Sequence, residues 1–524
     1  MRPDVSPGSW FAARADRTPE RIALTYAGVS RTYAQMLDRV VRLAGVLSAA
    51  GARSGERVGY LGSNHPLGYE LLLACSTTGA IFVPINIRLA PPEIDYIVGD
   101  AGLRALLVGP GFAELSGRLH LEGIDHLFTA ESVDVAHVDV ERAIGSSAGL
   151  ADVVRHHHDD DDVAVLIYTS GTTGSPKGAM LTNGNLWWNN VNAMHALDVL
   201  ENEIALVMAP IFHIAGINGL TLRTWQKGGE VVLLERFDPG EVIRQVEQRR
   251  VTTLFGVPTM LKAVAEHDAF EAADLSSIRV LLSSSAPVPM DLLKIYEARG
   301  LAVHQGYGLT EAAPVATMLG TEWATTKIGS AGIAPLFCDV RIAPPVGSAS
   351  PQSSSEDVSS ETRRQGEILV RGPNVMKGYW NDPSATAETI DAEGWLHTGD
   401  VGYQDEDGFL YVIDRIRDLI ISGGENIYPA EVENVLQEHP KVGEVAVIGE
   451  ADDHWGEHVV AVVVPREGVE ALSLDEVRDF ASKKLARYKL PQRLVTVSAL
   501  PYNGAGKVLR RELRTRLCTP GVAR

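Results

Sequence analysis

The sequence predicts an α/β protein with more than one domain, and three observations lead to this prediction. The chain has 524 residues, which is too long for a single hydrophobic core, so two or more domains are expected. Residues 1–160 alternate between amphipathic helical segments and short apolar segments, the pattern of a mostly parallel sheet covered by helices. Residues 415–524 contain strand-like and helical segments of their own, which predict a small α+β domain.

The individual elements follow from hydrophobic periodicity along the chain. Residues 31–44 have an amphipathic pattern that predicts a helix, with Thr32 as its N-cap. Residues 344–365 are rich in serine and cannot bury enough apolar surface to order, so they predict a mobile loop. Strands are predicted at 57–62, 80–85, 163–167, 204–208, 331–342 and 367–371, and helices at 69–78 and 183–194.

Composition and charge limit the class of protein. Hydrophobic residues make up 45% and charged residues 22% of the chain, as in an ordinary soluble globular protein. The formal net charge of −20 argues against nucleic acid as a partner and is compatible with a local basic pocket. The cysteines lie far apart, which suggests a reducing, cytoplasmic compartment. We expect no membrane span, because no apolar run is long enough, and no signal peptide is visible.

A loop rich in glycine and hydroxyl side chains follows the apolar run at 163–167. Its glycines let backbone N–H groups surround an anion, and Lys177 adds a positive charge suited to phosphate. A Walker A loop needs Gly-Lys-Ser/Thr, whereas here Pro176 precedes the lysine and Gly178 follows it. We therefore expect a different kind of nucleotide phosphate loop. Its residues are Thr169, Ser170, Gly171, Thr172, Thr173, Gly174 and Lys177.

The order of these residues resembles the phosphate loop of adenylate-forming enzymes, which include acyl-CoA synthetases, adenylation domains of peptide synthetases and firefly-type luciferases. Later motifs extend the resemblance over essentially the whole chain, and overall it is to bacterial fatty-acyl and aryl-CoA ligases. The resemblance implies a large N-terminal domain, residues 1–414, with two α/β sheets and a small β-barrel-like subdomain. It also implies a small mobile α+β domain at residues 415–524.

A second motif, residues 304–311, has the chemistry of a nucleotide and metal site. Glycines allow tight turns around a ligand, a tyrosine offers a stacking face, and Glu311 can hold a hard cation through oxygen. The resemblance implies that Gly306, Tyr307 and Gly308 lie at adenine, that Thr310 lies near phosphate and that Glu311 binds Mg²⁺.

Two further segments resemble the walls of the substrate site. His213 lies in a Pro-x-Phe-His-x-x-Gly segment that resembles the one beside the acyl pocket, where this chain has no acidic residue. Ala286 and Pro287 match residues near adenine. Ser284 and Ser285 stand where the family usually has two glycines, and their side chains are expected to narrow or reshape the neighbouring pocket.

The C-terminal motifs supply the remaining candidates, whose roles are carried over from the resemblance. Asp400 is expected to bind the ribose hydroxyls, with Arg415 as its partner, and Arg417 is expected to be the hinge between the domains. Lys507 lies in a glycine-flanked turn and resembles the catalytic lysine of the adenylation step. Gly424 and Glu425 are expected to line the channel for coenzyme A, where Glu425 approaches His213.

Together these motifs predict an acyl-CoA synthetase that uses ATP, Mg²⁺ and coenzyme A. The acid is expected to be a small hydrophobic molecule, because the segments that would form its pocket carry no charged residue. Rotation of the second domain would bring first Lys507 and then the coenzyme A channel to one site. A homodimer is compatible with this reading.

Other activities of the same fold stay open at the level of sequence. An enzyme of this fold can perform one half-reaction only, either forming the acyl-adenylate or converting a supplied one to the thioester. An acyl-AMP ligase can load a carrier protein, although its family usually has an insertion where residues 386–395 are short here. A luciferase-like oxygenase and a non-catalytic nucleotide-binding protein are the remaining alternatives.

Overall fold

The computed structural model divides into two compact units. Unit 1 comprises residues 1–340 and 370–397, and unit 2 comprises residues 341–369 and 398–524. A domain division at residue 415 stays a prediction. The residues described are 4–131, 138–148, 158–169, 176–197, 199–286, 288–343, 365–415, 418, 420–422, 425–427, 429–452, 456–469, 472–485, 487–503 and 507–518. The predicted loop at 344–365 therefore lies almost entirely outside the described residues.

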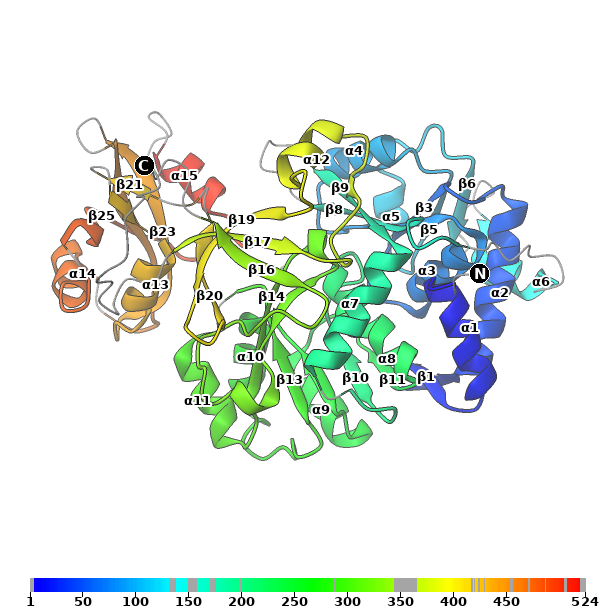
Figure 1. The fold of residues 1–524 in the computed structure, drawn as a ribbon, viewed down its shortest axis with the longest axis horizontal. Coiled ribbons are helices and arrows are strands. Elements are labelled where there is room, and N and C mark those ends of the chain that lie inside the picture. Colours follow the sequence, from blue (N-terminus) through cyan, green and yellow to red (C-terminus); the bar gives the residue numbers. More distant parts are fainter. Residues whose placement is uncertain are drawn as a thin grey trace. The chain divides into compact units, whose positions relative to one another are not determined.

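The first sheet of unit 1 has eight strands in the order β15-β14-β13-β12-β10-β11-β1-β2 (Figure 1). Its central strands are parallel, as predicted from the alternation of strands and helices, and β2 and β15 pair antiparallel at the two edges. The strands are β1 Ile22–Tyr26, β2 Val29–Thr32, β10 Ile204–Val207, β11 Glu230–Leu233, β12 Thr253–Phe255, β13 Val280–Ser283, β14 Val303–Gly308 and β15 Val315–Met318.

The second sheet of unit 1 has the order β18-β9-β8-β4-β3-β5-β6-β7. Strands β8 and β9 are antiparallel neighbours, and β18 adds to β9 from a part of the chain two hundred positions later. The strands are β3 Arg57–Leu61, β4 Ile81–Ile85, β5 Ala105–Val108, β6 His126–Thr129, β7 Val138–Asp139, β8 Val163–Thr169, β9 Lys177–Thr182 and β18 Gly378–Tyr379.

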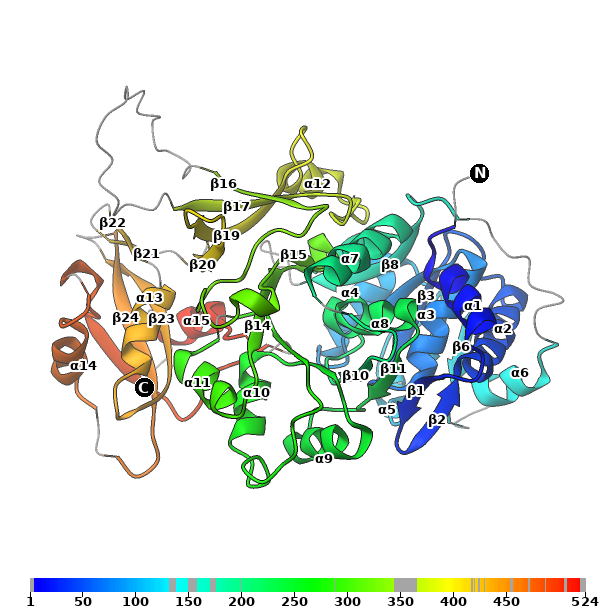
Figure 2. The same cartoon turned by 60° about the horizontal axis from the view of Figure 1, so that its bottom comes forward.

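Helices cover both sheets and enclose the apolar core. The largest core cluster joins residues of both sheets through α1, α2, α3, α7 and α8, and the first three of these helices lie side by side (Figure 2). A second cluster packs α9, α10 and α11 on the first sheet, and a third packs α4 on the second sheet. The helices are α1 Pro7–Arg17, α2 Tyr33–Ala49, α3 Pro66–Thr78, α4 Pro91–Ala101, α5 Ala113–Ser116, α6 Val140–Ser146, α7 Asn183–Ala196, α8 Thr221–Lys227, α9 Pro239–Arg249, α10 Pro258–Ala265, α11 Met290–Ala298 and α12 Pro383–Thr389.

Unit 2 contains most of a four-stranded sheet in the order β16-β17-β19-β20 and a further sheet in the order β22-β21-β24-β23, with β25 beside β24. The latter sheet packs on α13 and α14 around its own apolar cluster, which fits the predicted small α+β domain. The elements are β16 Asp339–Ala343, β17 Gly366–Arg371, β19 Leu396–Gln404, β20 Leu410–Arg415, β21 Ile420–Ser422, β22 Glu425–Ile427, α13 Pro429–Gln437, β23 Val442–Asp452, β24 Gly456–Pro465, α14 Leu474–Ala481, β25 Arg493–Thr496 and α15 Arg510–Cys518.

Most elements predicted from periodicity are confirmed, and one is corrected. The Thr32 hydroxyl caps α2 by accepting a hydrogen bond from the backbone N–H of Gln35 at 3.2 Å, and the Thr32 N–H donates to Gln35 Oε1 at 2.9 Å. The strand predicted at 331–342 is wrong over its first part, because β16 begins only at Asp339. Gly332 has φ +87° and Pro335 has no N–H to donate, so neither residue fits the hydrogen-bond pattern of a β-sheet.

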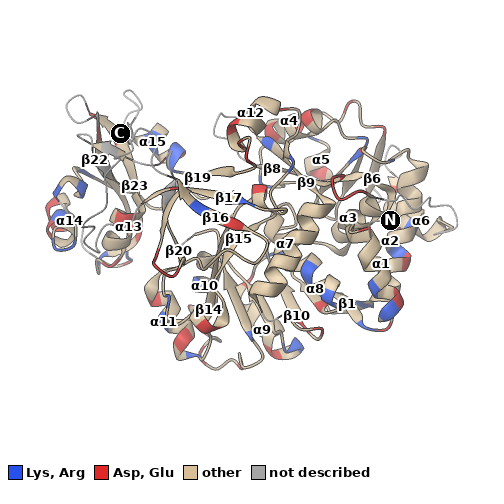
Figure 3. Ribbon diagram, viewed as in Figure 1, with Lys and Arg blue, Asp and Glu red and all other residues tan. Residues whose placement is uncertain are grey.

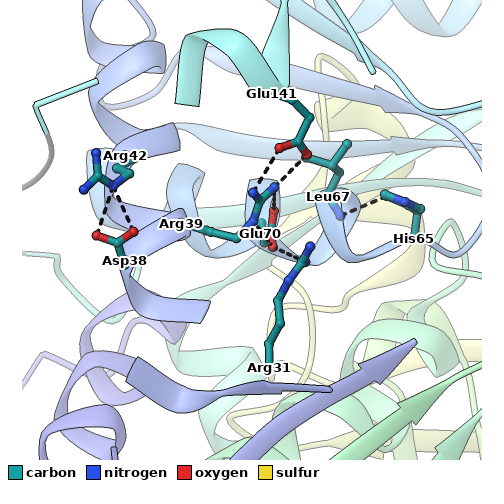
Figure 4. Close-up of polar contacts among 8 residues, drawn as sticks. All are labelled: Arg31, Asp38, Arg39, Arg42, His65, Leu67, Glu70 and Glu141. Atoms are coloured by element: carbon teal, nitrogen blue, oxygen red, sulfur yellow. Dashed lines mark hydrogen bonds and ion pairs between the residues drawn. The ribbon is translucent and has the colours of Figure 1, made fainter. Parts of the chain in front are cut away.

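A buried carboxylate ties the N-terminal elements together (Figure 4). The Glu70 side chain in α3 is 0% exposed. Arg39 of α2 donates to both Glu70 oxygens at 2.7 and 2.9 Å, and Arg31 of β2 donates a third bond at 2.8 Å. Arg39 also donates to both oxygens of Glu141 in α6. Two guanidinium groups and two carboxylates therefore pair across four elements, which fixes their packing.

His65 gives this region a predicted dependence on pH. Its Nδ1 caps α3 by accepting a hydrogen bond from the Leu67 N–H at 3.3 Å, and burial, followed by the charge of Arg31, lowers the pKa of His65 to about 4. Between an unfolded pKa of 6.5 and this value, the unfolded chain binds a proton that the folded chain does not. The stabilisation is therefore complete above the unfolded pKa and is lost as the pH falls towards the folded pKa.

We expect the His65→Asn variant to lose less stability on acidification, because asparagine keeps an N-cap acceptor and does not titrate. The urea midpoint, measured between about pH 7 and about pH 5, should fall more steeply with decreasing pH in the parent protein than in the variant. Parallel curves would mean that His65 does not titrate in this range.

Charged side chains are interspersed on the surface helices. In Figure 3 basic and acidic positions share the same helices, α9 and α14 among them. Within the described ranges, no helix combines the length and the apolar character that crossing a bilayer requires.

Candidate active site

The predicted phosphate loop connects the two strands of a hairpin, β8 and β9. Thr169 at the end of β8 pairs in register with Lys177 at the start of β9, so both ends of the loop meet at one edge of the sheet. Ser170, Gly171, Thr172, Thr173 and Gly174 lie outside the described residues. The apolar strand predicted to lead into the loop is confirmed, since β8 covers all of residues 163–167.

The base of the loop is held by contacts from α4. The Tyr168 hydroxyl donates to the Asp100 carboxylate at 2.5 Å. The indole N–H of Trp380, next to β18, donates to the Asp100 carbonyl at 3.2 Å. Asp100 therefore anchors both the strand that enters the loop and the segment that follows β18.

The predicted adenine and metal motif lies at the end of β14, where the strand pairs antiparallel with β15. A Cβ at Gly308 would overlap the carbonyl oxygen of Pro314, so only glycine fits this close approach. Thr310 opens a one-turn 3₁₀ helix, Thr310–Ala312, and the Asn374 amide donates to the Ala312 carbonyl at 2.9 Å. This turn sets the position of Glu311, while Gly306 and Tyr307 remain on the strand.

Glu311 is brought to the phosphate loop. Its Oε1 accepts hydrogen bonds from the Thr169 hydroxyl at 3.4 Å and from the Tyr379 hydroxyl at 3.0 Å. Burial, followed by the charge of Glu311, raises the pKa of the Tyr379 phenol, which therefore stays a hydrogen-bond donor. Two motifs far apart in sequence thus meet in unit 1.

The donor set suits a magnesium ion that arrives with its nucleotide. Among the described residues, no three acidic, histidine or cysteine side chains gather into a metal cage. Mg²⁺ usually binds through one or two carboxylates together with substrate phosphates, and Glu311 beside the loop provides one such oxygen ligand.

Lys177 lies at the far end of the loop among groups that orient its charge. Its ammonium lies 5.4 Å from the centre of the Tyr379 ring and 3.9 Å from a carboxylate oxygen of Asp382. Both contacts are weak enough for a phosphate group to replace or join them.

The segment after β13 carries backbone strain where the sequence departs from the family pattern. Ser285 has φ +77°, the left-handed region that disfavours a side chain, whereas Ser284 lies outside that region. Ser285 and Ala286 are exposed, and Pro287 is outside the described residues. The serine therefore occupies a position whose backbone suits glycine.

We expect Ser285→Gly to raise the free energy of unfolding by about 0.5–1 kcal/mol, because relief of the left-handed strain exceeds the added chain entropy. Ser284→Gly is the matched control and should lower stability slightly. Urea titrations of the three proteins would test this, and destabilisation by both substitutions would contradict the expectation.

The same two variants, assayed with a range of carboxylic acids, should accept bulkier acids than the parent protein does if these side chains narrow the acid pocket.

His213 lies in a tightly bonded turn after β10. The His213 N–H donates to the Pro210 carbonyl at 3.0 Å, and the Gly216 N–H donates to the His213 carbonyl at 2.9 Å. Its ring lies 4.8 Å from that of Phe212, measured between centroids. The following π-helix, η2 Ala215–Gly219, is held by Tyr69, whose hydroxyl donates to the Gly216 carbonyl at 3.0 Å. His213 is therefore fixed on a rigid segment.

In unit 2, Asp400 lies on β19 opposite Arg415 of β20 in the antiparallel register. Asp400 is 6% exposed, and its N–H donates to the Thr398 hydroxyl at 3.1 Å. The register brings the predicted ribose pair together at the level of the backbone.

Lys507 closes a turn whose ends are bonded to each other. The Lys507 N–H donates to the Asn503 side chain at 2.9 Å, and the Asn503 N–H donates to the Lys507 carbonyl at 2.8 Å. Three residues later, Arg510 donates to both Glu433 oxygens at 2.6 and 2.8 Å, which joins the turn to α13. Arg417 and Gly424 lie outside the described residues, and only the backbone of Glu425 is described, in β22.

Sequence reasoning missed Tyr379, Asp382 and Asp100, which support the loop and Glu311. Each acts from a segment distant in the chain, so no local motif contains them. The available signal was weak: an aromatic pair, Tyr379 and Trp380, between Gly378 and the start of a helix.

Comparison with known proteins gives matches over nearly the whole chain. Residues 11–380 match the family of AMP-binding enzymes, and residues 431–507 match the AMP-binding enzyme C-terminal domain.

Three relatives illustrate the similarity. A feruloyl-CoA synthase of Amycolatopsis sp is 47% identical over 509 residues, which cover 97% of this chain and 98% of the relative. An indoleacetate–CoA ligase of Aromatoleum aromaticum is 39% identical over 507 residues, covering 96% and 97%. The structure of o-succinylbenzoate CoA synthetase from Bacillus subtilis with its acyl-adenylate intermediate has a TM-score of 0.83, 34% identity and 98% coverage of both chains. The structure of that enzyme with ATP and magnesium ion has a TM-score of 0.82, 34% identity and coverage of 96% and 99%.

Proposed function

Because the chain belongs to the AMP-binding enzyme family and is an AMP-forming acid–thiol ligase, we propose that it activates an aromatic, hydrophobic carboxylic acid with ATP and passes the acyl group to coenzyme A. Under this proposal one chain performs both half-reactions.

The chemistry of the proposal has two steps. The carboxylate oxygen attacks the α-phosphorus of ATP, the bond to the bridging oxygen breaks, and pyrophosphate leaves. The acyl carbon then carries AMP as its leaving group in place of oxide. In the second step the coenzyme A sulfur, having lost its proton, attacks the acyl carbon, and AMP leaves with the electron pair of the broken C–O bond.

The first step brings two anions together, so positive charge and donors must offset their repulsion. The observation that carries this part of the proposal is the contact of Thr169 with Glu311, because it joins the phosphate loop to the metal carboxylate. Glu311 would hold Mg²⁺, which neutralises phosphate charge when bound. Lys177 and the hydroxyls of the loop would hold the β- and γ-phosphates, and Thr310 would lie beside them.

The remaining roles are proposed from the positions of the motifs. Asp400 with Arg415 would hold the ribose, and Tyr307 with Ala286 and Pro287 would enclose adenine. Lys507 would stabilise the transition state of adenylation. In the second step Gly424 and Glu425 would line the coenzyme A channel beside His213, after rotation at Arg417.

The proposal of an aromatic acid is supported by the relatives. The feruloyl-CoA synthase and the indoleacetate–CoA ligase are named for aromatic acids, and they are 47% and 39% identical to this chain over nearly its whole length. The segment around His213 is also apolar, with Phe212, Ile214 and Ile217 buried.

A screen of acids tests the proposal, with ferulate, indoleacetate, 2-succinylbenzoate and straight-chain alkanoates as the panel. Each acid is scored separately for acyl-AMP and for acyl-CoA. We expect the highest kcat/KM for an aryl acid, and both products. Preference for alkanoates would overturn the substrate class, and acyl-AMP without acyl-CoA would indicate an enzyme of one half-reaction.

A further inference from the structure

Tyr379 contacts both ionic groups of the described phosphate site. Its hydroxyl donates to Glu311 Oε1 at 3.0 Å, and the centre of its ring lies 5.4 Å from Lys177 Nζ. The carboxylate and the ammonium belong to different motifs, and neither motif contains Tyr379. A single side chain therefore lies between the group that would hold the metal and the group that would hold phosphate.

The backbone of Tyr379 is fixed to the strand that carries Lys177. Strand β18 pairs antiparallel with β9, with Tyr379 opposite Ala179. The Trp380 N–H donates to the Gly178 carbonyl at 2.7 Å, and the Tyr379 N–H donates to the Thr386 hydroxyl at 2.9 Å. The Tyr379 backbone is thus held by β9 on one side and by α12 on the other.

The hydrogen bonds at Glu311 select which of its oxygens faces a ligand. The hydroxyls of Tyr379 and Thr169 both approach Oε1, so they define the rotation of the carboxylate. Hydroxyl or amide groups that hold a ligating side chain in one orientation commonly raise metal affinity by about 10–100-fold. The Tyr379 hydroxyl has the position of such a group.

The face of the Tyr379 ring forms a cation–π contact with the ammonium group of Lys177. A cation near an aromatic face is attracted to it, and this attraction limits the directions that the flexible lysine samples. A carboxylate oxygen of Asp382 lies 3.9 Å from the same ammonium and attracts it electrostatically from another direction.

We propose that Tyr379 is a positioning residue, whose hydroxyl orients Glu311 towards the divalent cation that accompanies ATP and whose ring orients Lys177 towards the phosphates. This inference rests on the proposed function, since it presupposes that the site binds ATP with Mg²⁺. It adds a residue from outside the loop and outside the Glu311 motif to the site.

The test is equilibrium binding of ATP to the full chain, measured by calorimetry over a range of Mg²⁺ concentrations and in excess EDTA. Tyr379→Phe keeps the ring and removes the hydroxyl. We expect the Mg²⁺ concentration for half-maximal enhancement of ATP binding to rise by about 10-fold or more, with unchanged binding in EDTA. Tyr379→Leu also removes the ring, and it should weaken ATP binding in EDTA as well.

Tyr296→Phe is the matched control, because it also removes a tyrosine hydroxyl, in this case a buried one that donates to the Leu261 carbonyl at 2.8 Å. It should lower thermal stability and leave the Mg²⁺ dependence unchanged. A Tyr379→Phe protein with the Mg²⁺ dependence of the parent would overturn the inference and leave the proposed function intact. A parent protein that binds no ATP at any Mg²⁺ concentration would instead overturn the proposed function itself, and the inference with it.

Discussion

Lys507→Ala is expected to lower acid-dependent pyrophosphate exchange by about 10²-fold or more, the usual effect of removing one charged partner of a transition state. The reason is the meeting of two anions in the first step, which needs a cation at the attacked phosphate. The Lys507 turn is closed by bonds between Asn503 and the Lys507 backbone, and these bonds do not depend on the lysine side chain. The substitution should therefore leave the turn in place.

The measurement separates the half-reactions in one preparation. Pyrophosphate exchange reports adenylation, and conversion of synthetic acyl-AMP to acyl-CoA reports thioester formation, which should survive in Lys507→Ala. Lys484→Ala removes another lysine of unit 2, one paired with Glu438 on the surface, and should affect neither reaction. If Lys507→Ala lowered both reactions equally, Lys507 would not be specific to the first step.

The second large effect is expected on stability. Glu70→Ala should lower the free energy of unfolding by about 3–5 kcal/mol, because breaking a buried ion pair leaves an uncompensated charge behind. The Glu70 side chain is 0% exposed and accepts hydrogen bonds from Arg31 and Arg39 (Figure 4). Removing its carboxylate would therefore leave these two guanidinium groups without this partner, next to the cavity that the substitution creates. Glu141 can still neutralise part of the charge on Arg39.

Asp38→Ala is the control for this prediction. Asp38 pairs with Arg42 on the exposed face of α2, where its side chain is 60% exposed, and such a pair contributes about 0.5 kcal/mol. Urea denaturation followed by tryptophan fluorescence would compare both variants with the parent protein. Equal, small losses in the two variants would mean that water reaches the Glu70 cluster.

The local features of the site were predictable from sequence because each motif carries its own chemistry. A strand that leads into a loop of glycines, hydroxyls and a lysine predicts phosphate binding, and β8 leads into that loop as expected, whereas β9, which follows the loop, was not predicted. Glu311 was proposed as a metal ligand because it stands next to a glycine-rich turn, and the structure brings its carboxylate to the hydroxyl of Thr169 at the start of the loop. These motifs do not contain their partners, because Tyr379 reaches the site through the pairing of β18 with β9 and Asp100 reaches it from helix α4.

Backbone conformation also could not be predicted from the sequence. The two serines after β13 stand out as a departure from the family pattern, yet the residue types alone do not say which of them is strained. The structure separates them, since only Ser285 has a positive φ. The same limit explains the error at residues 331–342, where Gly332 and Pro335 outweigh an apolar pattern.

The division into compact units has a consequence for synthesis on the ribosome. The chain passes from one unit to the other at three points, between residues 340 and 341, 369 and 370, and 397 and 398. Residues 341–369 therefore leave the exit tunnel before unit 1 is complete, and well before β19 and β20 exist to join their sheet. Because domains fold as units during translation, β17 lacks its neighbouring strand β19 while residues 370–397 complete unit 1. A stop codon placed between the units at any single point leaves one of them without part of its own chain.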